Sequence, residues 1–183
     1  MNRSLRTLIF INSIFIVGAN LLGPLYAVFV ESIGGGVIEV SFTWSTFLVA
    51  TTLTTYILSR YGDQIRETEY LLIAGFFLRA LAWFSLIFVS SLPQLILVQI
   101  VIGIGEGLGT PAFDVIFAEH LDRGKHVREY STWKIYSNLL GALAVGVGGI
   151  IVANYSFSTL FVLMGISATI AGFIALTQPR KLL

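Results

Sequence analysis

The chain has 183 residues, of which 56% are hydrophobic and 11% are charged, and its mean hydropathy is +0.86. This composition is too apolar for a water-soluble domain of this size and predicts a protein that crosses a membrane several times. A formal net charge of +1 gives no indication of nucleic acid binding, and the lack of cysteine excludes disulfides, iron–sulfur clusters and thiolate zinc sites.

Six apolar segments follow one another along the chain. They span roughly residues 7–30, 38–58, 70–90, 93–118, 130–153 and 157–177. Each can cross a bilayer, because about 20 residues at ~1.5 Å rise span a hydrocarbon core of ~30 Å. The first segment is too long for a signal peptide, and no small-residue cleavage site ends it. We therefore expect one all-α membrane domain over residues 1–183, with six transmembrane helices.

The basic residues predict how these helices are oriented. All Lys and Arg except Arg79 lie before the first segment, in or beside the connections after the second and fourth, or after the sixth. The other connections carry only the acids Glu31 and Glu39. Because cytoplasmic loops are enriched in Lys and Arg, we expect a multi-pass protein of the cell (inner) membrane with both termini in the cytoplasm.

The fourth segment has features that a lipid-facing anchor does not need. Its small or helix-bending positions are Gly103, Gly105, Gly107, Gly109 and Pro111, and its acids are Glu106 and Asp114. Glycines let another helix approach closely, and carboxylates in hydrocarbon are costly unless they face a partner or water. We therefore expect an inner helix. The same packing role is predicted for glycines of the fifth segment, namely Gly141, Gly146, Gly148 and Gly149.

Arg79 and Glu106 are the two charges nearest the middle of the membrane. Counted from the cytoplasmic ends of the third and fourth segments, both should lie ~13–18 Å deep. Left unpaired, each would cost ~2.5–3.5 kcal/mol or more, so we expect them to meet directly or through one water. The pair could be a structural ion pair that fixes helix packing, or it could face a water-filled path and bind substrate or a proton.

An internal repeat is suggested by two similar stretches. GPLYAVFV at residues 23–30 resembles TPAFDVIF at 110–117, an offset that also matches Gly18 with Gly105. FTW at 42–44 likewise resembles STW at 131–133. Because the first segment would run outward and the fourth inward, this would be an inverted 3+3 repeat. The alternative is chance similarity between apolar helices.

The fourth segment resembles the fourth transmembrane helix of the major facilitator superfamily. That helix has the pattern G-x-G-x-G, then a proline–alanine pair, then an acid at its cytoplasmic end. The matching residues here are Gly103, Gly105, Gly107, Pro111, Ala112 and Glu119. Six helices with a cytoplasmic N-terminus also match one half of such a transporter, which has twelve helices. The resemblance therefore implies a major-facilitator-like half.

The connection between the second and third segments is similar to the superfamily's loop G-x-x-x-D-R-x-G-R, but it departs from that pattern. In SRYGDQIRE, Arg60 and Gly62 keep R-x-G, whereas Ser59 stands at the aspartate and Asp63 at a basic position. The resemblance implies a cytoplasmic gate whose candidates are Arg60, Gly62, Asp63, Arg66, Asp114 and Glu119. Glu119 would pair with Arg60 or Arg66. These groups could equally be solvated interfacial charges, whose ion pairs contribute little.

The resemblance also implies a cavity between helices one and four. Asn12 and Asn20 lie in the first of these, and Gln99 lies seven residues before Glu106 in the other, within about 20° of the same face. Asn20, Arg79, Gln99 and Glu106 are thus candidates for a substrate or proton path. The alternative for the amides is hydrogen bonding between helices, worth ~0.6 kcal/mol on average. Gln99 stands where exporters driven by proton exchange carry an arginine.

Nothing in the sequence indicates an enzyme. H-E-x-x-H and G-x-S-x-G are absent from it. The glycines of the fourth segment lack the preceding strand of a nucleotide site, and His120 and His126 lack flanking metal ligands. We therefore expect no catalytic residue, no metal and no cofactor.

The expected function is secondary transport of a small solute by alternating access. The expected partners are membrane lipid, the solute, and a second copy or a separate six-helix half, with the second and fifth segments at the interface of a homodimer. The alternative is a membrane interaction or scaffold protein, or a truncated remnant of a twelve-helix transporter, as the altered loop and the half length suggest. A cavity that reaches Asn20, Gln99 and Glu106 would distinguish the two.

Overall fold

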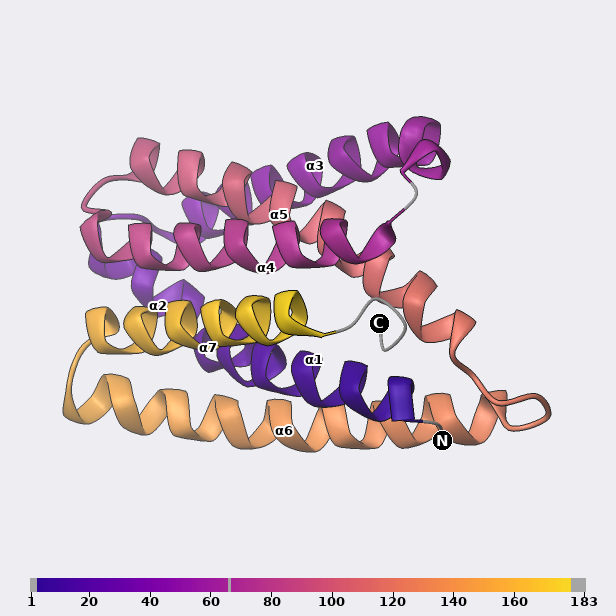
Figure 1. The fold of residues 1–183 in the computed structure, drawn as a ribbon. Helices are drawn as coiled ribbons and strands as arrows, with labels where there is room; N and C mark the ends of the chain where they lie inside the picture. Colours follow the sequence, from indigo (N-terminus) through magenta and orange to yellow (C-terminus); the bar gives the residue numbers. More distant parts are fainter. Residues whose placement is uncertain (1–2, 66, 179–183) are drawn as a thin grey trace.

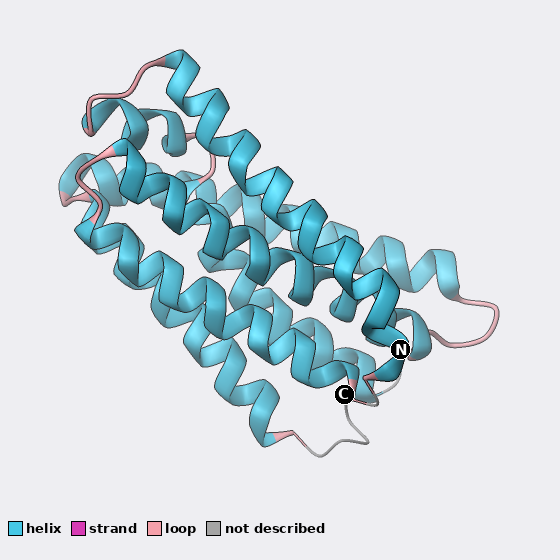
Figure 2. Ribbon diagram, turned by 90° about the horizontal axis from the view of Figure 1, so that it is seen from above, coloured by secondary structure: helices cyan, strands magenta, loops and turns pink. Residues whose placement is uncertain are grey.

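The computed structural model describes residues 3–65 and 67–178, with Asp63 described by its backbone alone. In those residues the chain forms helices and no strand (Figures 1 and 2). The α-helices are α1 (Arg3–Leu22), α2 (Leu25–Ser32), α3 (Val37–Tyr61), α4 (Thr68–Ser85), α5 (Leu92–Glu119), α6 (His126–Asn154) and α7 (Phe157–Thr177). Two short 3-10 helices, Gly62–Gln64 and Leu86–Phe88, follow α3 and α4. All of them except α2 and the 3-10 turns are long and apolar enough to cross a membrane, which confirms six spans.

The first segment is not the single helix that its hydropathy predicts. It divides into α1 and α2 at Gly23 and Pro24. Gly23 adopts a positive φ of +32°, which disfavours residues with a side chain, and Pro24 has no N–H to continue the helix. The other five long helices begin and end within a few residues of the expected ranges; α6, for example, begins four residues earlier than expected, at His126.

The six long helices pack in the order α3, α5, α4, α7, α1, α6. Exchanging α1, α3 and α4 with α5, α6 and α7, respectively, reverses this order but keeps the same neighbouring pairs, as the expected 3+3 repeat requires. The repeat also appears in single contacts. Tyr26 of α2 packs on Trp44 of α3 at 5.5 Å between ring centroids, and the matching Phe113 packs on Trp133 at 5.4 Å.

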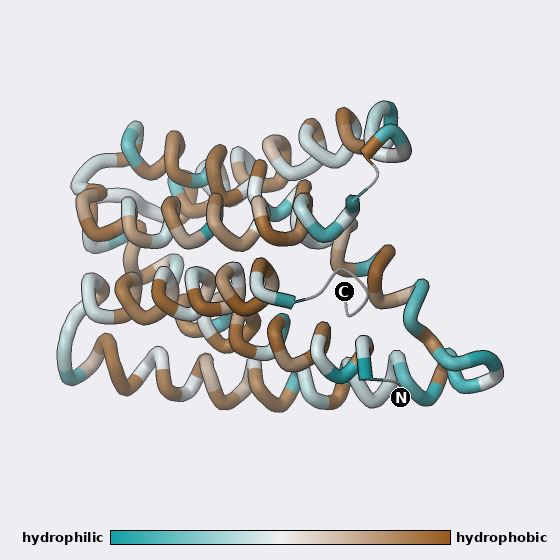
Figure 3. The backbone as a smooth tube through the Cα atoms, in the orientation of Figure 1, coloured by the Kyte–Doolittle hydropathy of each residue, from teal (hydrophilic) through white to brown (hydrophobic). Residues whose placement is uncertain are grey.

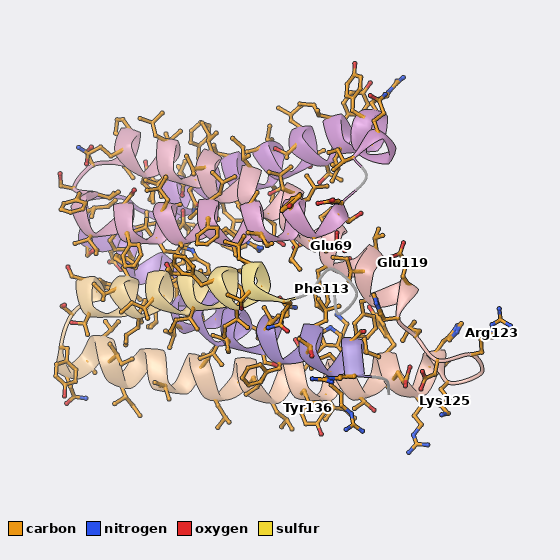
Figure 4. All side chains as sticks on the ribbon, viewed as in Figure 1. Glu69, Phe113, Glu119, Arg123, Lys125 and Tyr136 are labelled. Carbon is orange, nitrogen blue, oxygen red and sulfur yellow. The ribbon has the colours of Figure 1, made fainter. Side chains whose placement is uncertain are left out.

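The two ends of the bundle differ in polarity. The described ends of the chain, in α1 and α7, lie at the same end as the connections α3–α4 and α5–α6 (Figure 1). Hydrophilic residues gather there, most visibly around the α5–α6 connection, whereas the helices are hydrophobic along their length (Figure 3). Arg123 and Lys125 project from this connection (Figure 4). We call this the basic end, and the other the opposite end.

Candidate functional site

Arg79 and Glu106 form a direct ion pair between α4 and α5. The guanidinium Nη1 donates to Glu106 Oε2 at 2.6 Å, which confirms the contact expected from their equal depth. The Arg79 side chain is only 4% exposed, but that of Glu106 is 32% exposed. The acid is therefore the member of the pair that a solute or water can reach.

The surroundings of the pair hold both partners in place. Arg79 Nε donates to the carbonyl of Gly75 at 3.0 Å, and the guanidinium carbon lies 4.0 Å from the centroid of the Phe15 ring. Thr110 Oγ1 donates to the second oxygen of Glu106, Oε1, at 2.5 Å. A cation over an aromatic face and a carboxylate with both oxygens bonded are favourable arrangements for charges removed from bulk water.

Glycines of α5 make room for Arg79. A Cβ atom at Gly105 would lie 2.9 Å from Arg79 Cγ, and one at Gly109 would lie 2.5 Å from Nη2. Gly75 of α4 faces the same two glycines, and its own Cβ would lie 2.6 Å from Gly109 Cα. Close packing of two backbones thus creates the slot that the arginine occupies.

The four alternate glycines of α5 face two different helices, because residues four apart share one helix face. Gly105 and Gly109 face α4, whereas Gly103 and Gly107 face α3, where added Cβ atoms would lie within 2.8 Å of the Phe47 and Thr51 carbonyls. Pro111 lies in α5 without ending it. In α6, Gly141 packs on Asn20 and Gly148 on the Leu21 backbone. Gly146 and Gly149 have no atom of the described residues within 4 Å of an added Cβ, so their packing role is not seen within this chain.

The ion pair lies where two cavities meet. The first, which we call the distal cavity, has a volume of about 270 Å³ and extends toward the opposite end. It is lined by Asn20, Arg79, Gln99 and Glu106, the four residues predicted from sequence to share a polar path, and by aromatic rings that include Trp44 and Trp83.

The second, the proximal cavity, has a volume of about 260 Å³ and extends toward the basic end. It shares Arg79 and Glu106 with the distal cavity and is also lined by Asn12, Asp114 and Lys134. A single ion pair therefore forms the boundary between two spaces that lie along the direction of the helices.

A buried hydrogen-bonded chain beside the distal cavity includes two residues that the sequence did not single out. Gln99 Nε2 donates to Tyr26 Oη at 2.6 Å, and Tyr26 donates to Thr43 Oγ1 at 2.6 Å. Thr43 donates in turn to the Glu39 carbonyl at 2.7 Å. This chain joins α5, α2 and α3, and it holds the short α2 helix over the end of the cavity.

Replacing Tyr26 by phenylalanine should lower thermal stability while keeping the ring packing on Trp44. Gln99 loses its acceptor, and a buried amide left unpaired costs ~1–3 kcal/mol. Thermal unfolding of the detergent-solubilised protein, followed by tryptophan fluorescence, measures this. Tyr56→Phe is the matched control, because that exposed hydroxyl only accepts from the exposed Arg60 at 3.1 Å. Equal stability of Tyr26→Phe and the wild type would contradict a stabilising role for the chain.

The candidate gate residues are only partly brought together. Gly62 and Glu119 line one groove between α3, α4 and α5, whereas Asp114 lies in the proximal cavity. Arg60 lies over Tyr56 of its own helix, and the expected pair of Arg60 with Glu119 does not form in this structure. Arg66 and the side chain of Asp63 lie outside the described residues.

Comparisons with known proteins agree with this architecture. The model of the Major Facilitator Superfamily matches residues 8–182. The chain is also similar to an uncharacterised MFS-type transporter of Bacillus subtilis (strain 168), YitZ, with 20% identity over 143 residues, which are 78% of this chain and 87% of that protein. A family match over nearly the whole chain, together with six apolar spans around a charged pair, shows that this multi-pass membrane protein belongs to the major facilitator superfamily.

Proposed function

We propose that this protein moves a small solute across the membrane by alternating access, as one half of a transporter completed by a second copy or by a separate six-helix half. The observation that carries the proposal is the Arg79–Glu106 pair, which separates two cavities extending toward opposite ends of the bundle. A carboxylate that is 32% exposed at that boundary can contact a solute from either side. A purely structural ion pair would need no such access.

The need for a second half follows from what the chain leaves uncovered. Only 6% of the α3 span and 17% of the α6 span is buried, against 39% or more in each of the other four spans. On α6, the unoccupied Gly146 and Gly149 lie beside exposed Val147 and Ile150. In lipid, this surface forgoes the close helix packing that small residues permit, and a second set of helices would supply it.

The polar face of α5 supports the same conclusion. Thr110 and Asp114 are exposed, and they follow Glu106 at intervals of four residues along one face. Polar groups facing hydrocarbon are unfavourable. Halves of transporters in this class are related by an axis along the membrane normal, so two identical chains can place these faces opposite one another without inverting either.

The dimer can be tested by crosslinking, because the chain contains no cysteine. Ile150→Cys, exposed on α6 beside Gly146 and Gly149, should crosslink between copies in native membranes, whereas the control Phe173→Cys, exposed on α7, should not. The mass of the protein in detergent-free nanodiscs should be that of two chains. A monomer that still transports at all protein-to-disc ratios would rule the homodimer out.

Transport itself can be tested with proteoliposomes incubated in a mixed metabolite extract, whose contents are then compared by mass spectrometry. We expect at least one solute to be enriched by the wild type and to be enriched several-fold less by Asn20→Leu. Asn20 lines the distal cavity, and within the described residues its side chain bonds only the Ile16 carbonyl of its own helix, so we expect the protein still to fold. No enrichment by a correctly folded dimer would favour the alternative, a membrane interaction protein.

The orientation we propose places the basic end in the cytoplasm of the cell, at its inner membrane. In the sequence, every Lys and Arg except Arg79 lies before α1, in or beside the α3–α4 and α5–α6 connections, or after α7, and these connections meet at the basic end, in keeping with the positive-inside rule. A reporter active only in the cytoplasm should be silent when inserted at Asn154, between α6 and α7. The same reporter inserted at Gly124, in the α5–α6 connection, should be active. The reverse pattern would overturn the orientation.

A further inference from the structure

The proximal cavity is lined by a polar side chain that makes no hydrogen bond within the described residues. Asn12 of α1 is only 8% exposed, and it lines the cavity. Its amide has no hydrogen bond within the residues that the structure describes, unlike Asn20, which bonds the Ile16 carbonyl. The Asn12 amide is not among the fully enclosed polar atoms without a partner, so it is open to a water or a bound molecule in the cavity.

Two opposite charges line the same cavity from different helices. Asp114 comes from α5 and Lys134 from α6, and both are exposed. Asp114 and Lys134 interact electrostatically, yet they form no ion pair in the described structure. The contact recorded for the Lys134 ammonium is with the ring of Tyr130, at 5.6 Å from its centroid. The carboxylate and the ammonium are therefore both available to a third molecule.

We propose that the proximal cavity binds a zwitterionic solute, one that carries an ammonium and a carboxylate group. This rests on the proposed transport function and names the class of its substrate. The ammonium of the solute pairs with Asp114, its carboxylate pairs with Lys134, and the amide of Asn12 bonds a further polar group. The Arg79–Glu106 pair closes the far side of the site.

Charge balance is the reason to choose a zwitterion over an ion. Arg79 and Glu106 neutralise each other, and Asp114 and Lys134 sum to zero, so the site has no net charge to offer a solute. A cation or an anion would use one of the two open charges and leave the other unpaired in a partly dehydrated space, at a cost. A zwitterion satisfies both. The volume of about 260 Å³ fits a molecule smaller than a drug-sized ligand.

Binding to the full chain in nanodiscs tests this without requiring transport. The probes are the free amino acids, each compared with its N-acetyl derivative, which lacks the ammonium, and its amide derivative, which lacks the carboxylate. We expect isothermal titration to detect binding of at least one free amino acid, and both capped forms to bind about tenfold more weakly or worse, the range for losing a charge-assisted hydrogen bond.

Variants test which charged group of the solute Asp114 and Lys134 each bind. Asp114→Asn should weaken binding of the free amino acid about tenfold but should not weaken binding of the N-acetyl form, which has no ammonium to lose a partner. Lys134→Gln should likewise weaken the free amino acid about tenfold without weakening the amide form, which has no carboxylate. Lys125→Gln is the matched control, since it removes a cation from the α5–α6 connection outside the cavity. Asn12→Leu should weaken all three ligands. Asp114 and Lys134 are exposed, so these changes spare the fold.

Three results would overturn the proposal: no free amino acid binds, the capped forms bind as well as the free ones, or Lys125→Gln weakens binding as much as Lys134→Gln. Enrichment in proteoliposomes of a solute that lacks either group would overturn it while leaving the transport function standing. Zwitterion binding without transport of any solute would instead remove the transport function alone.

Discussion

Replacing Glu106 by glutamine is expected to be among the most damaging single changes in this protein. It leaves the guanidinium of Arg79, only 4% exposed, without a counter-charge. Removing one partner of a buried ion pair costs ~3–5 kcal/mol, because the remaining charge stays desolvated. We expect a large drop in the unfolding temperature and loss of transport. Detergent-based unfolding, followed by tryptophan fluorescence, and proteoliposome uptake measure the two effects.

The exposures of the two partners predict an asymmetry. Arg79→Gln leaves Glu106 32% exposed and still bonded by Thr110, so it should be milder than Glu106→Gln. The double variant should recover part of the lost stability, since no unpaired charge remains. A double variant as unstable as Glu106→Gln alone would show that the pair does not determine the effect. Stability restored without transport would separate the structural role from the functional one.

Gly148→Ala is expected to be the second severe change. The added Cβ would overlap the backbone carbonyl of Leu21, and a backbone atom cannot turn aside as a side chain can. α1 and α6 would have to separate, and overpacking of this kind costs ~1–3 kcal/mol or more. The unfolding temperature of the solubilised monomer measures it.

Gly146→Ala and Gly149→Ala are matched controls on the same helix, because nothing in the described chain lies within 4 Å of their added Cβ atoms. They should leave monomer stability unchanged or raise it slightly, as alanine favours helix over glycine by up to ~1 kcal/mol. In membranes, the same two variants should weaken crosslinking of the proposed dimer. Equal damage from all three would mean that α6 packs within the chain differently from this structure.

The spans and the ion pair could be predicted from sequence because each follows from the position of residues along the chain. Hydropathy and length give the spans, and depth along two antiparallel helices gives the match of Arg79 with Glu106. The break at Gly23 and Pro24 was missed because apolar residues continue on both sides of it, so hydropathy does not change. The Gly-Pro pair itself was the available signal.

The bonding partners of Gln99 and Arg60 could not be predicted in the same way. Gln99 and Tyr26 are 73 residues apart, and a tyrosine in an apolar segment resembles any other core aromatic. The expected pair of Arg60 with Glu119 depended on a family pattern that this loop only partly keeps. In the structure, the guanidinium of Arg60 instead contacts Tyr56, four residues away on the same helix.

The packing order of the helices also constrains how the chain is made. The principal neighbours of α1 are α6 and α7, those of α4 are α5 and α7, and that of α3 is α5. In the described residues, the backbones of the first three long helices do not pack closely on one another, although the Phe15 ring of α1 reaches Phe76 and Trp83 of α4. At ~5–20 residues synthesised per second, α3 and α4 enter the bilayer before their shared neighbour α5, and α1 enters before its neighbours α6 and α7. Until α5 follows, Arg79 has no carboxylate partner, and an unpaired charge within the membrane is costly. We expect membrane quality control to recognise the chain most readily during this interval.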